Sequence, residues 1–387
     1  MNICIFTGAR PNFVKVAPLL RAIEGMNHSL NSRLSSLNVQ LVYAGSENDS
    51  TLEPSLFDDL SIRKPDVFLG VECENLNELT GLVMSKFEEY LQQHPTDVVV
   101  VVDDLASAMA ASIVTKKQGI CLAHIAAGTR SFDISMPKEI NRLVIDGLSD
   151  ILFTAGISNN SIANKEGAEL SKVYMVGNIL IDNIRYNQSR WVRPAILDTL
   201  NSQLPPSLNR EGRGGSSTLN PQPYLVFTLN RKALMADIEN LKKMLEVMIQ
   251  EAGDMPILAP LRGQAKEVVA TLAENFTDAQ LRHFHFIPPL SYLEFGWLTA
   301  HAAGIITDSG NVAEEATFNY VPCITLNSYT EHIETVKVGS NVLVGEDPER
   351  LAEAVRDMVG GQWKPSNIPD RWDGRTAERI LQILSKR

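Results

Sequence analysis

A run of five consecutive valines, at residues 98–102, is the feature that most restricts how this chain can fold. An uninterrupted β-branched run has no polar side, so it suits a strand that is covered by helices on both faces. Similar short apolar runs occur nearby, each followed by a stretch of helical character. These runs are residues 3–7, 41–44, 120–125 and 151–154. The alternation predicts an α/β domain built on a parallel sheet.

A second series of the same kind begins after residue 220 and predicts another α/β unit, which 387 residues are enough to form. We therefore expect two Rossmann-like domains that face a cleft, with ligands at the carboxyl ends of the strands. A last helix, near residues 375–384, is expected to return to the first domain. The expected first domain comprises residues 1–185 and 368–387, followed by a linker or insertion at 186–223 and a second domain at 224–367.

Charge and composition argue against several classes of partner. Asp and Glu number 46 against 35 Lys and Arg, so the net charge is -11, and no basic run is present to bind nucleic acid. No apolar run approaches the length of a membrane span, and a cytoplasmic protein is expected. The four cysteines are scattered, without metal-binding spacing. We expect no metal, no cofactor and no disulfide.

The segment after the first strand reads Gly8-Ala9-Arg10-Pro11 and places Lys15 about one helical turn further on. Gly8 suits a tight turn and Pro11 suits the first helical position, so the helix start and the two cations form an anion site. An ordinary turn with surface cations is the alternative. The segment is not GxGxxG, so it gives no support for nicotinamide binding.

Acidic residues stand where two further strands end. Asp103-Asp104 directly follows the valine run, and one of the two is expected to face the crevice, because neighbouring strand residues point in opposite directions. Capping of the next helix is the alternative. After His124, a glycine-containing loop leads to Pro137, which opens a helix that carries Glu139 and Arg142. Simple complementarity to the helix dipole is the alternative for Glu139.

The segment 307–315, Thr-Asp-Ser-Gly-Asn-Val-Ala-Glu-Glu, repeats the order of strand, glycine turn and helix. Ser309 and the amide of Gly310 are suited to a phosphate at the helix start. Glu315 is suited to accept hydrogen bonds from sugar hydroxyls. The sequence thus predicts a second anion site in the second domain.

Five motifs together resemble the UDP-N-acetylglucosamine 2-epimerase family: GARPNFVKVAPL, HIAAGTRSFDISMPKEINR, GNILID, TDSGNVAEEA and YTEHIETV. Their order and spacing match over essentially the whole chain. The resemblance implies a glycosyltransferase-B-type fold and a UDP-sugar substrate, in surface polysaccharide or amino-sugar biosynthesis. It implies elimination of UDP to a 2-acetamidoglucal and re-addition with inversion at C2, or, in a hydrolysing branch, release of the free sugar. We also expect a homodimer.

The resemblance implies a role for individual residues. Lys15, Asp104, Glu139 and His124 are the expected catalytic residues. The expected substrate-binding residues are Arg10 for the phosphates, Phe295 for the uracil, Ser309, Gly310 and Glu315 for the diphosphate and ribose, and also Arg142 and Asn178.

The chain also departs from the family pattern. The family's HxEAG motif has Ala126 in place of its catalytic Glu, and the family's His-Arg pair has Asn230 in place of its catalytic His. Asn12 replaces the Glu of a GTRPE start, and Ser46-Glu47 stands at a Gln-His effector pattern. Two alternatives therefore stay open, which are glycosyl transfer to an acceptor and UDP-sugar binding without turnover.

Overall fold

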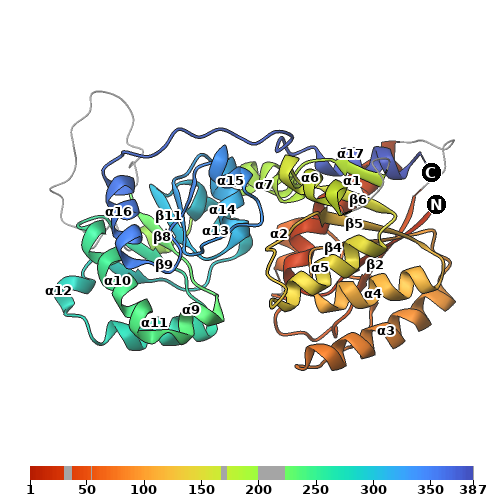
Figure 1. Ribbon diagram of the computed structural model, residues 1–387, viewed down its shortest axis with the longest axis horizontal. Coiled ribbons are helices and arrows are strands. Elements are labelled where there is room, and N and C mark those ends of the chain that lie inside the picture. Colours follow the sequence, from red (N-terminus) through yellow and green to blue (C-terminus); the bar gives the residue numbers. More distant parts are fainter. Residues whose placement is uncertain (30–36, 54, 167–171, 199–222, 387) are drawn as a thin grey trace. The chain divides into compact units, whose positions relative to one another are not determined.

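The computed structural model describes residues 1–29, 37–53, 55–166, 172–198 and 223–386 (Figure 1). The chain divides into two compact units. The first unit comprises Met1–Asn187, Glu331–Lys337 and Ile368–Arg387, and the second comprises Gln188–Thr330 and Val338–Asn367. Segment 331–337 therefore lies with the first unit, whereas the sequence-based boundaries put it in the second domain. Residues 199–222 of the predicted linker or insertion at 186–223 lie outside the described residues.

The described part of the first unit contains a seven-stranded parallel sheet in the order β3-β2-β1-β4-β5-β6-β7. Its strands are β1 (Asn2–Thr7), β2 (Asn38–Tyr43), β3 (Val67–Phe68), β4 (Val98–Val102), β5 (Cys121–Ala127), β6 (Ile151–Thr154) and β7 (Val173–Met175). The valine run forms β4 at the centre, and all five valines are buried, as expected for a strand covered on both faces.

Helices cover both faces of this sheet. The helices of the first unit are α1 (Arg10–Ser29), α2 (Leu56–Leu60), α3 (Leu76–Gln93), α4 (Ala106–Lys117), α5 (Pro137–Leu148), α6 (Ile157–Lys165), α7 (Ile179–Asn187), α15 (Glu334–Lys337) and α17 (Thr376–Leu384). Helix α4 packs between α3 and α5, and α1 packs against α7 and α17 (Figure 1). The expected return of the last helix to the first unit is confirmed.

The second unit repeats the plan with a six-stranded parallel sheet, within the described residues, in the order β10-β9-β8-β11-β12-β13. Its strands are β8 (Leu225–Phe227), β9 (Ile257–Ala259), β10 (Phe284–Phe286), β11 (Gly304–Thr307), β12 (Cys323–Thr325) and β13 (Asn341–Leu343). Its helices are η2 (Gln188–Arg190), α9 (Lys232–Ala236), α10 (Ile238–Ala252), α11 (Gly263–Ala273), α12 (Asp278–Leu281), α13 (Tyr292–Ala300), α14 (Gly310–Phe318) and α16 (Pro348–Val359). The predicted α/β fold with two Rossmann-like units is confirmed.

Local sequence signals set several helix starts. Asn75 accepts hydrogen bonds from the backbone amides of residues 77 and 78 at the start of α3, and Asp347 does the same for residues 349 and 350 at α16. Pro137 occupies the first turn of α5, where no amide is needed. Within the part of the chain that the structure describes, no helix has the length and apolar character needed to cross a membrane.

Two glycines test how tightly the first unit is packed near β5. Gly119 and Gly128 have nearly the same left-handed φ, +72° and +71°, so alanine at either position carries the same backbone strain. A Cβ at Gly119 would meet open space, whereas one at Gly128 would lie 2.2 Å from the carbonyl oxygen of Asn159 in α6. We expect Gly119→Ala to lower the free energy of unfolding by about 1 kcal/mol and Gly128→Ala by about 2–4 kcal/mol. Urea denaturation measures both, and equal losses would contradict the close approach of α6.

Candidate active site

Charged side chains gather in the first unit where β1, β4 and β5 end, because the carboxyl ends of neighbouring parallel strands meet at one edge of the sheet. Four of the predicted residues, Lys15, Asp104, Glu139 and Arg142, lie in this group with Asp103. The edge is therefore the candidate site, and its contacts can be followed residue by residue.

Asp103 is paired with the cation on α1. The Nζ of Lys15 lies 2.6 Å from Oδ1 of Asp103, and the side-chain amide of Asn12 donates to Oδ2 at 3.2 Å. The backbone of Asp103 has φ +61°, so it has left the strand conformation. We expected residues 103 and 104 to point in opposite directions because neighbouring residues of a strand do so. That rule does not apply here, because the strand has already ended at Asp103.

Asp104 is paired with the cation on α5. Nε and Nη2 of Arg142 lie 2.9 and 2.5 Å from Oδ2 of Asp104, and Nζ of Lys138 lies 3.5 Å from Oδ1. Burial opposes ionisation, but Lys138 and Arg142 together hold the pKa of Asp104 below its usual range. Helix α4 has Leu105 at its N-cap and no side-chain capping bond, so neither Asp103 nor Asp104 acts as the cap.

Glu139 is buried and fully hydrogen-bonded. Its carboxylate accepts the backbone amides of Ser131 and Phe132 at 2.9 and 3.0 Å and the Ser131 hydroxyl at 3.0 Å. Nη1 of Arg142 adds an ion pair at 3.1 Å. Burial opposes ionisation, yet the two amides and these partners hold the pKa of Glu139 below its usual range. The carboxylate thus binds the loop that precedes α5 and is more than a complement to the helix dipole.

Arg142 connects three carboxylates. Besides Asp104 and Glu139 it contacts Glu331, in the segment of residues 331–337 that belongs to the first unit. Sequence reasoning did not select Glu331, although the motif YTEHIETV contains it. Arg142 is almost completely buried, and although burial opposes its charge, Glu331 and Asp104 raise its pKa. It is thus placed to hold the site's acidic groups together.

His124, on β5, is buried beneath this edge. Its Nδ1 lies 2.6 Å from Oδ1 of Asp146 on α5, and its Nε2 lies 2.9 Å from the backbone oxygen of Asp103. Both ring nitrogens therefore face protein oxygens. Ala126, two residues later, has φ +70° and lies at a register shift between β5 and β6.

Two of the predicted substrate-binding residues of the first unit have local partners. Nε of Arg10 lies 2.5 Å from Oε2 of Glu53, and both side chains are partly exposed. Asn178 is buried, and its side-chain oxygen accepts the amide of Leu180 at 3.0 Å at the start of α7. The amide oxygen of Asn178 therefore helps to begin that helix.

The predicted anion site of the second unit lies at the end of β11. Ser309 is the N-cap of α14 and Gly310 is its first residue, and the Ser309 hydroxyl makes no capping bond to that helix. Next to them, Asp308 accepts the backbone amides of Asn230 and Arg231 at 2.7 and 2.5 Å. Burial raises the pKa of Asp308 although these amides oppose the shift. The helix start is thus available to an anion, and Asp308 ties the loop after β8 to it.

Glu315 and Phe295 differ in what surrounds them. Burial, with a smaller effect of the adjacent Glu314, raises the pKa of Glu315 to about 8. Phe295, on α13, packs against the apolar cluster that includes Leu298 and Ile305. A packing role accounts for this contact of Phe295, and its predicted role under the uracil stays a prediction.

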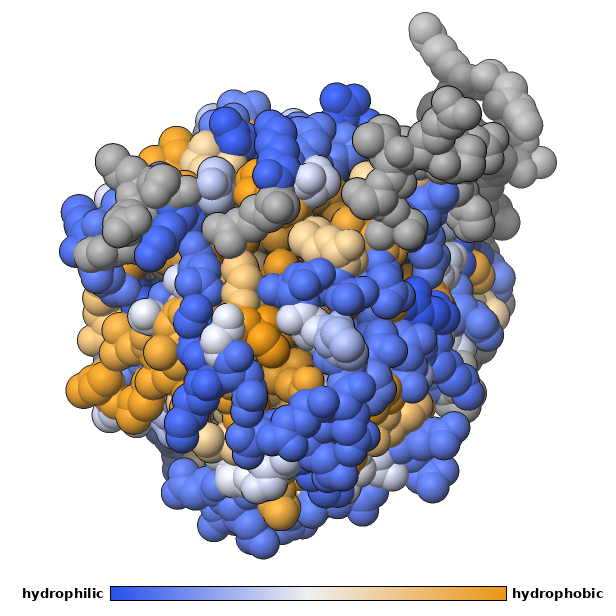
Figure 2. Space-filling model, turned by 90° about the vertical axis from the view of Figure 1, so that its right-hand side faces the viewer, coloured by the Kyte–Doolittle hydropathy of each residue, from blue (hydrophilic) through white to orange (hydrophobic). Residues whose placement is uncertain are grey.

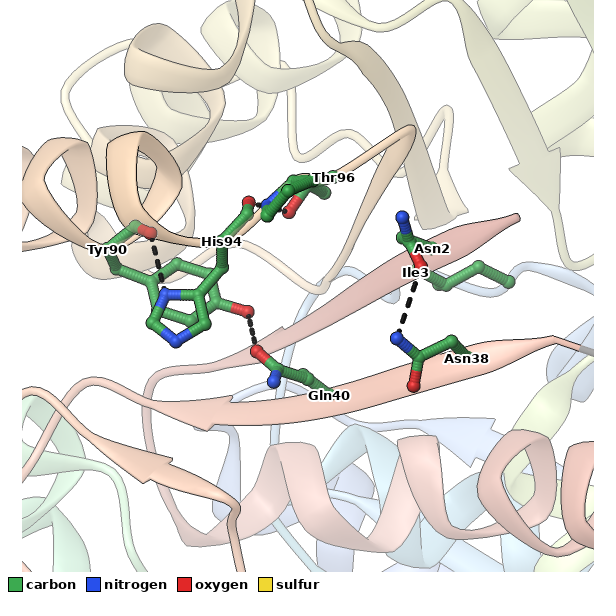
Figure 3. Close-up of a pocket in the computed structure, with 8 residues that line it drawn as sticks. Asn2, Ile3, Asn38, Gln40, Tyr90, His94 and Thr96 are labelled. Atoms are coloured by element: carbon green, nitrogen blue, oxygen red, sulfur yellow. Dashed lines mark hydrogen bonds between the residues drawn. The ribbon is translucent and has the colours of Figure 1, made fainter.

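A pocket of about 210 Å³ lies at the opposite end of the first sheet, near the amino ends of β1 and β2. In Figure 3, Gln40 points toward Tyr90, whose ring stacks on that of His94, and the side chains of Asn2 and Asn38 point toward each other. This pocket is separate from the charged edge. Across the described ranges, no group of three or more His, Cys, Asp or Glu side chains is arranged to hold a metal ion.

A comparison with known protein families shows the family to which this chain belongs. The family model for UDP-N-acetylglucosamine 2-epimerase matches residues 30–385. The chain belongs to this family. The resemblance that the five motifs indicated is thereby confirmed.

Relatives within this epimerase family match along the whole chain. The UDP-N-acetylglucosamine 2-epimerase of Methanocaldococcus jannaschii is 32% identical over 391 residues, which cover 100% of this chain and 99% of the relative. A UDP-2,3-diacetamido-2,3-dideoxy-D-glucuronate 2-epimerase of Pseudomonas aeruginosa is 28% identical over 394 residues, 100% of each chain. The crystal structure of the M. jannaschii enzyme with UDP-GlcNAc and UDP superposes with a TM-score of 0.81 at 30% identity, and covers 100% of both chains.

The raised pKa of Glu315 predicts that the free energy of unfolding of this protein depends on pH. Because the folded state holds this proton more tightly than the unfolded chain, the associated stability is present at low pH and is lost as the pH rises toward about 8. Glu315→Gln removes the titration. The free energy of unfolding of the variant, relative to the unmodified protein, should therefore increase between about pH 5 and about pH 8.

Urea denaturation at the two pH values measures this difference. Glu353→Gln, at an exposed position on α16, is the matched control and should show no comparable trend. A difference for Glu315→Gln that does not change with pH would show that Glu315 is not held in a protonated form by its surroundings.

Proposed function

We propose that this protein is an isomerase that inverts C2 of a UDP-linked 2-acetamido sugar by eliminating and re-adding UDP. Family membership and full-length similarity to two named 2-epimerases support the reaction class. One observation links the reaction to particular residues. Two ionised carboxylates, Asp104 and Glu139, are joined by the buried Arg142 at one edge of the first sheet.

The chemistry requires charged groups of both signs. The C2 proton is not next to a carbonyl, so its removal needs advanced cleavage of the C1–O bond and a well-placed base. In the proposal, one of the carboxylates, Asp104 or Glu139, takes the C2 proton as the C1–O bond breaks and UDP leaves. When UDP adds again, a proton returns to the opposite face of C2, and Lys15 stabilises charge near the reacting sugar. The pKa values of Asp104 and Glu139 are held below their usual range, so both carboxylates are ionised at neutral pH.

The leaving group needs its own partners. We assign the phosphates to Arg10, Ser309 and Gly310, since cations and helix-start amides stabilise a departing diphosphate. Glu315 is assigned to the ribose hydroxyls and Phe295 to the uracil. Arg142 and Asn178 are proposed to position the residues around the sugar, because their described hydrogen bonds are to other groups of the protein.

The proposal predicts deuterium incorporation. Incubation with UDP-GlcNAc in deuterium oxide should place deuterium at C2, which NMR detects in the sugar product. Asp104→Asn keeps the size of the side chain and removes its charge, so exchange should fall by about 100- to 10,000-fold, with UDP affinity by calorimetry changed far less. Glu89→Gln, an exposed position on α3, is the control and should exchange at the unmodified rate.

Any other outcome of the incubation with UDP-GlcNAc would indicate a different activity. Release of UDP only with an acceptor would establish glycosyl transfer, and binding without change would establish a UDP-sugar-binding protein. Release of the free epimerised sugar would place the chain in the hydrolysing branch. No observation in the structure favours the first two over epimerisation.

We further propose a cytoplasmic homodimer that acts in surface polysaccharide or amino-sugar biosynthesis. Large apolar side chains are exposed on α3 and α5, the two helices that flank α4: Leu76, Leu82, Ile140 and Leu143. Figure 2 shows that hydrophobic residues gather in patches among hydrophilic ones on one face of the molecule. A second copy of the chain is the proposed occupant of the α3–α5 surface, since exposed apolar patches commonly mark association sites.

Sedimentation velocity tests the dimer. The protein should sediment with twice the mass of one chain, and Leu82→Glu should shift it toward the monomer by placing a charge in the interface. Ile238→Glu, which changes an equally exposed apolar residue at the start of α10, is the control and should leave the mass unchanged. A monomeric unmodified protein would exclude the dimer.

A further inference from the structure

We propose that His124 is a permanently protonated positioning residue, whose imidazolium holds the Asp103–Asp104 turn in place and carries no proton to or from the sugar. The kinetic part of this inference rests on the proposed function, whereas the protonation of the ring does not.

The ring lies between two hydrogen-bond acceptors. Nε2 lies 2.9 Å from the backbone oxygen of Asp103, and a carbonyl oxygen only accepts, so Nε2 must carry a proton. Nδ1 lies 2.6 Å from Oδ1 of Asp146. A neutral imidazole has one N–H and satisfies one of these acceptors, whereas the imidazolium satisfies both.

Asp146 supplies the negative charge that this arrangement needs. Its second oxygen, Oδ2, accepts the amide of Gly128 at 3.0 Å and lies 2.8 Å from Nη1 of Arg130. Three donors thus converge on a buried carboxylate, which therefore has no reason to keep a proton of its own. Burial opposes its ionisation, yet His124 and Arg130 hold the pKa of Asp146 below its usual range.

The surrounding charges balance. Arg130 also pairs with Glu166, so His124 and Arg130 face two carboxylates. The residues in register with His124 on the neighbouring strands are Val101 on β4 and Leu152 on β6, which carry no charge. The side chain of Asp103, whose backbone oxygen the ring contacts, is paired with Lys15.

The bond to Asp103 acts on the site through the backbone. Asp103 has φ +61°, a conformation that L-residues adopt only at a cost, so it persists where neighbouring bonds hold it. His124 holds the carbonyl of residue 103, and Nδ2 of Asn141 holds the carbonyl of residue 104 at 2.8 Å. The two carbonyl anchors direct the Asp103 carboxylate to Lys15 and the Asp104 carboxylate to Arg142.

NMR of the ¹⁵N-labelled protein tests the protonation. The signals of His124 are identified by their absence in His124→Gln, and both of its ring nitrogens should show protonated imidazolium shifts from about pH 6 to about pH 8. Asp146→Asn removes the charge, so the ring should lose one proton within this range if that variant folds. An unprotonated nitrogen on His124 in the unmodified protein at neutral pH would overturn the proposal by itself.

Kinetics test the positioning role. His124→Phe removes both bonds and should lower kcat for C2 exchange by about tenfold or more, with the dissociation constant of UDP changed less than about threefold. His124→Gln retains one donor for the Asp103 carbonyl and should recover part of kcat. His94→Gln, in the pocket of Figure 3, is the control and should change neither quantity.

The two arms separate the possible failures. Absence of exchange in the unmodified protein would remove the proposed function and leave the NMR result to decide the state of His124. Normal exchange with a neutral His124, or a kcat that His124→Phe does not lower, would overturn this inference and leave the proposed function standing.

Discussion

The bend of the backbone at Asp103 is the constraint on which the candidate site depends. A buried valine strand delivers two carboxylates to the sheet edge, and the left-handed φ at Asp103 ends the strand there. Lys15 from α1 and Arg142 from α5 then neutralise one carboxylate each. A buried charge that loses its partner is costly, so each of these groups holds the others in place.

The pKa values of carboxylates are shifted in opposite directions in the two units, because their electrostatic environments differ. In the first unit, nearby cations and backbone amides lower the pKa values of Asp104 and Glu139, which keeps both ionised. In the second unit, burial next to another acid raises the pKa of Glu315. The first environment favours the charged carboxylate, and the second favours the neutral carboxyl group.

The departures at residues 126 and 230 belong to different structural settings. Ala126 occupies a left-handed position at a register shift between β5 and β6. Asn230 lies on a loop whose backbone amide is bound by Asp308. The loop's attachment therefore involves the backbone of residue 230, and its side chain can change without loss of that bond.

The sequence by itself determined the α/β class, the strands around the valine run, the return of the last helix and the epimerase family. Those features follow from local hydrophobic patterns and from motifs that occur in order along the chain. Only the tertiary structure decided that His124 binds Asp146 and Asp103, that Arg142 gathers Glu331, and that neither acid after the valines caps α4. These contacts join residues up to 189 positions apart and depend on a positive φ in a residue other than glycine. No short-range sequence pattern encodes these contacts or the positive φ. The partner of a side chain depends on which distant segments the sheet brings together.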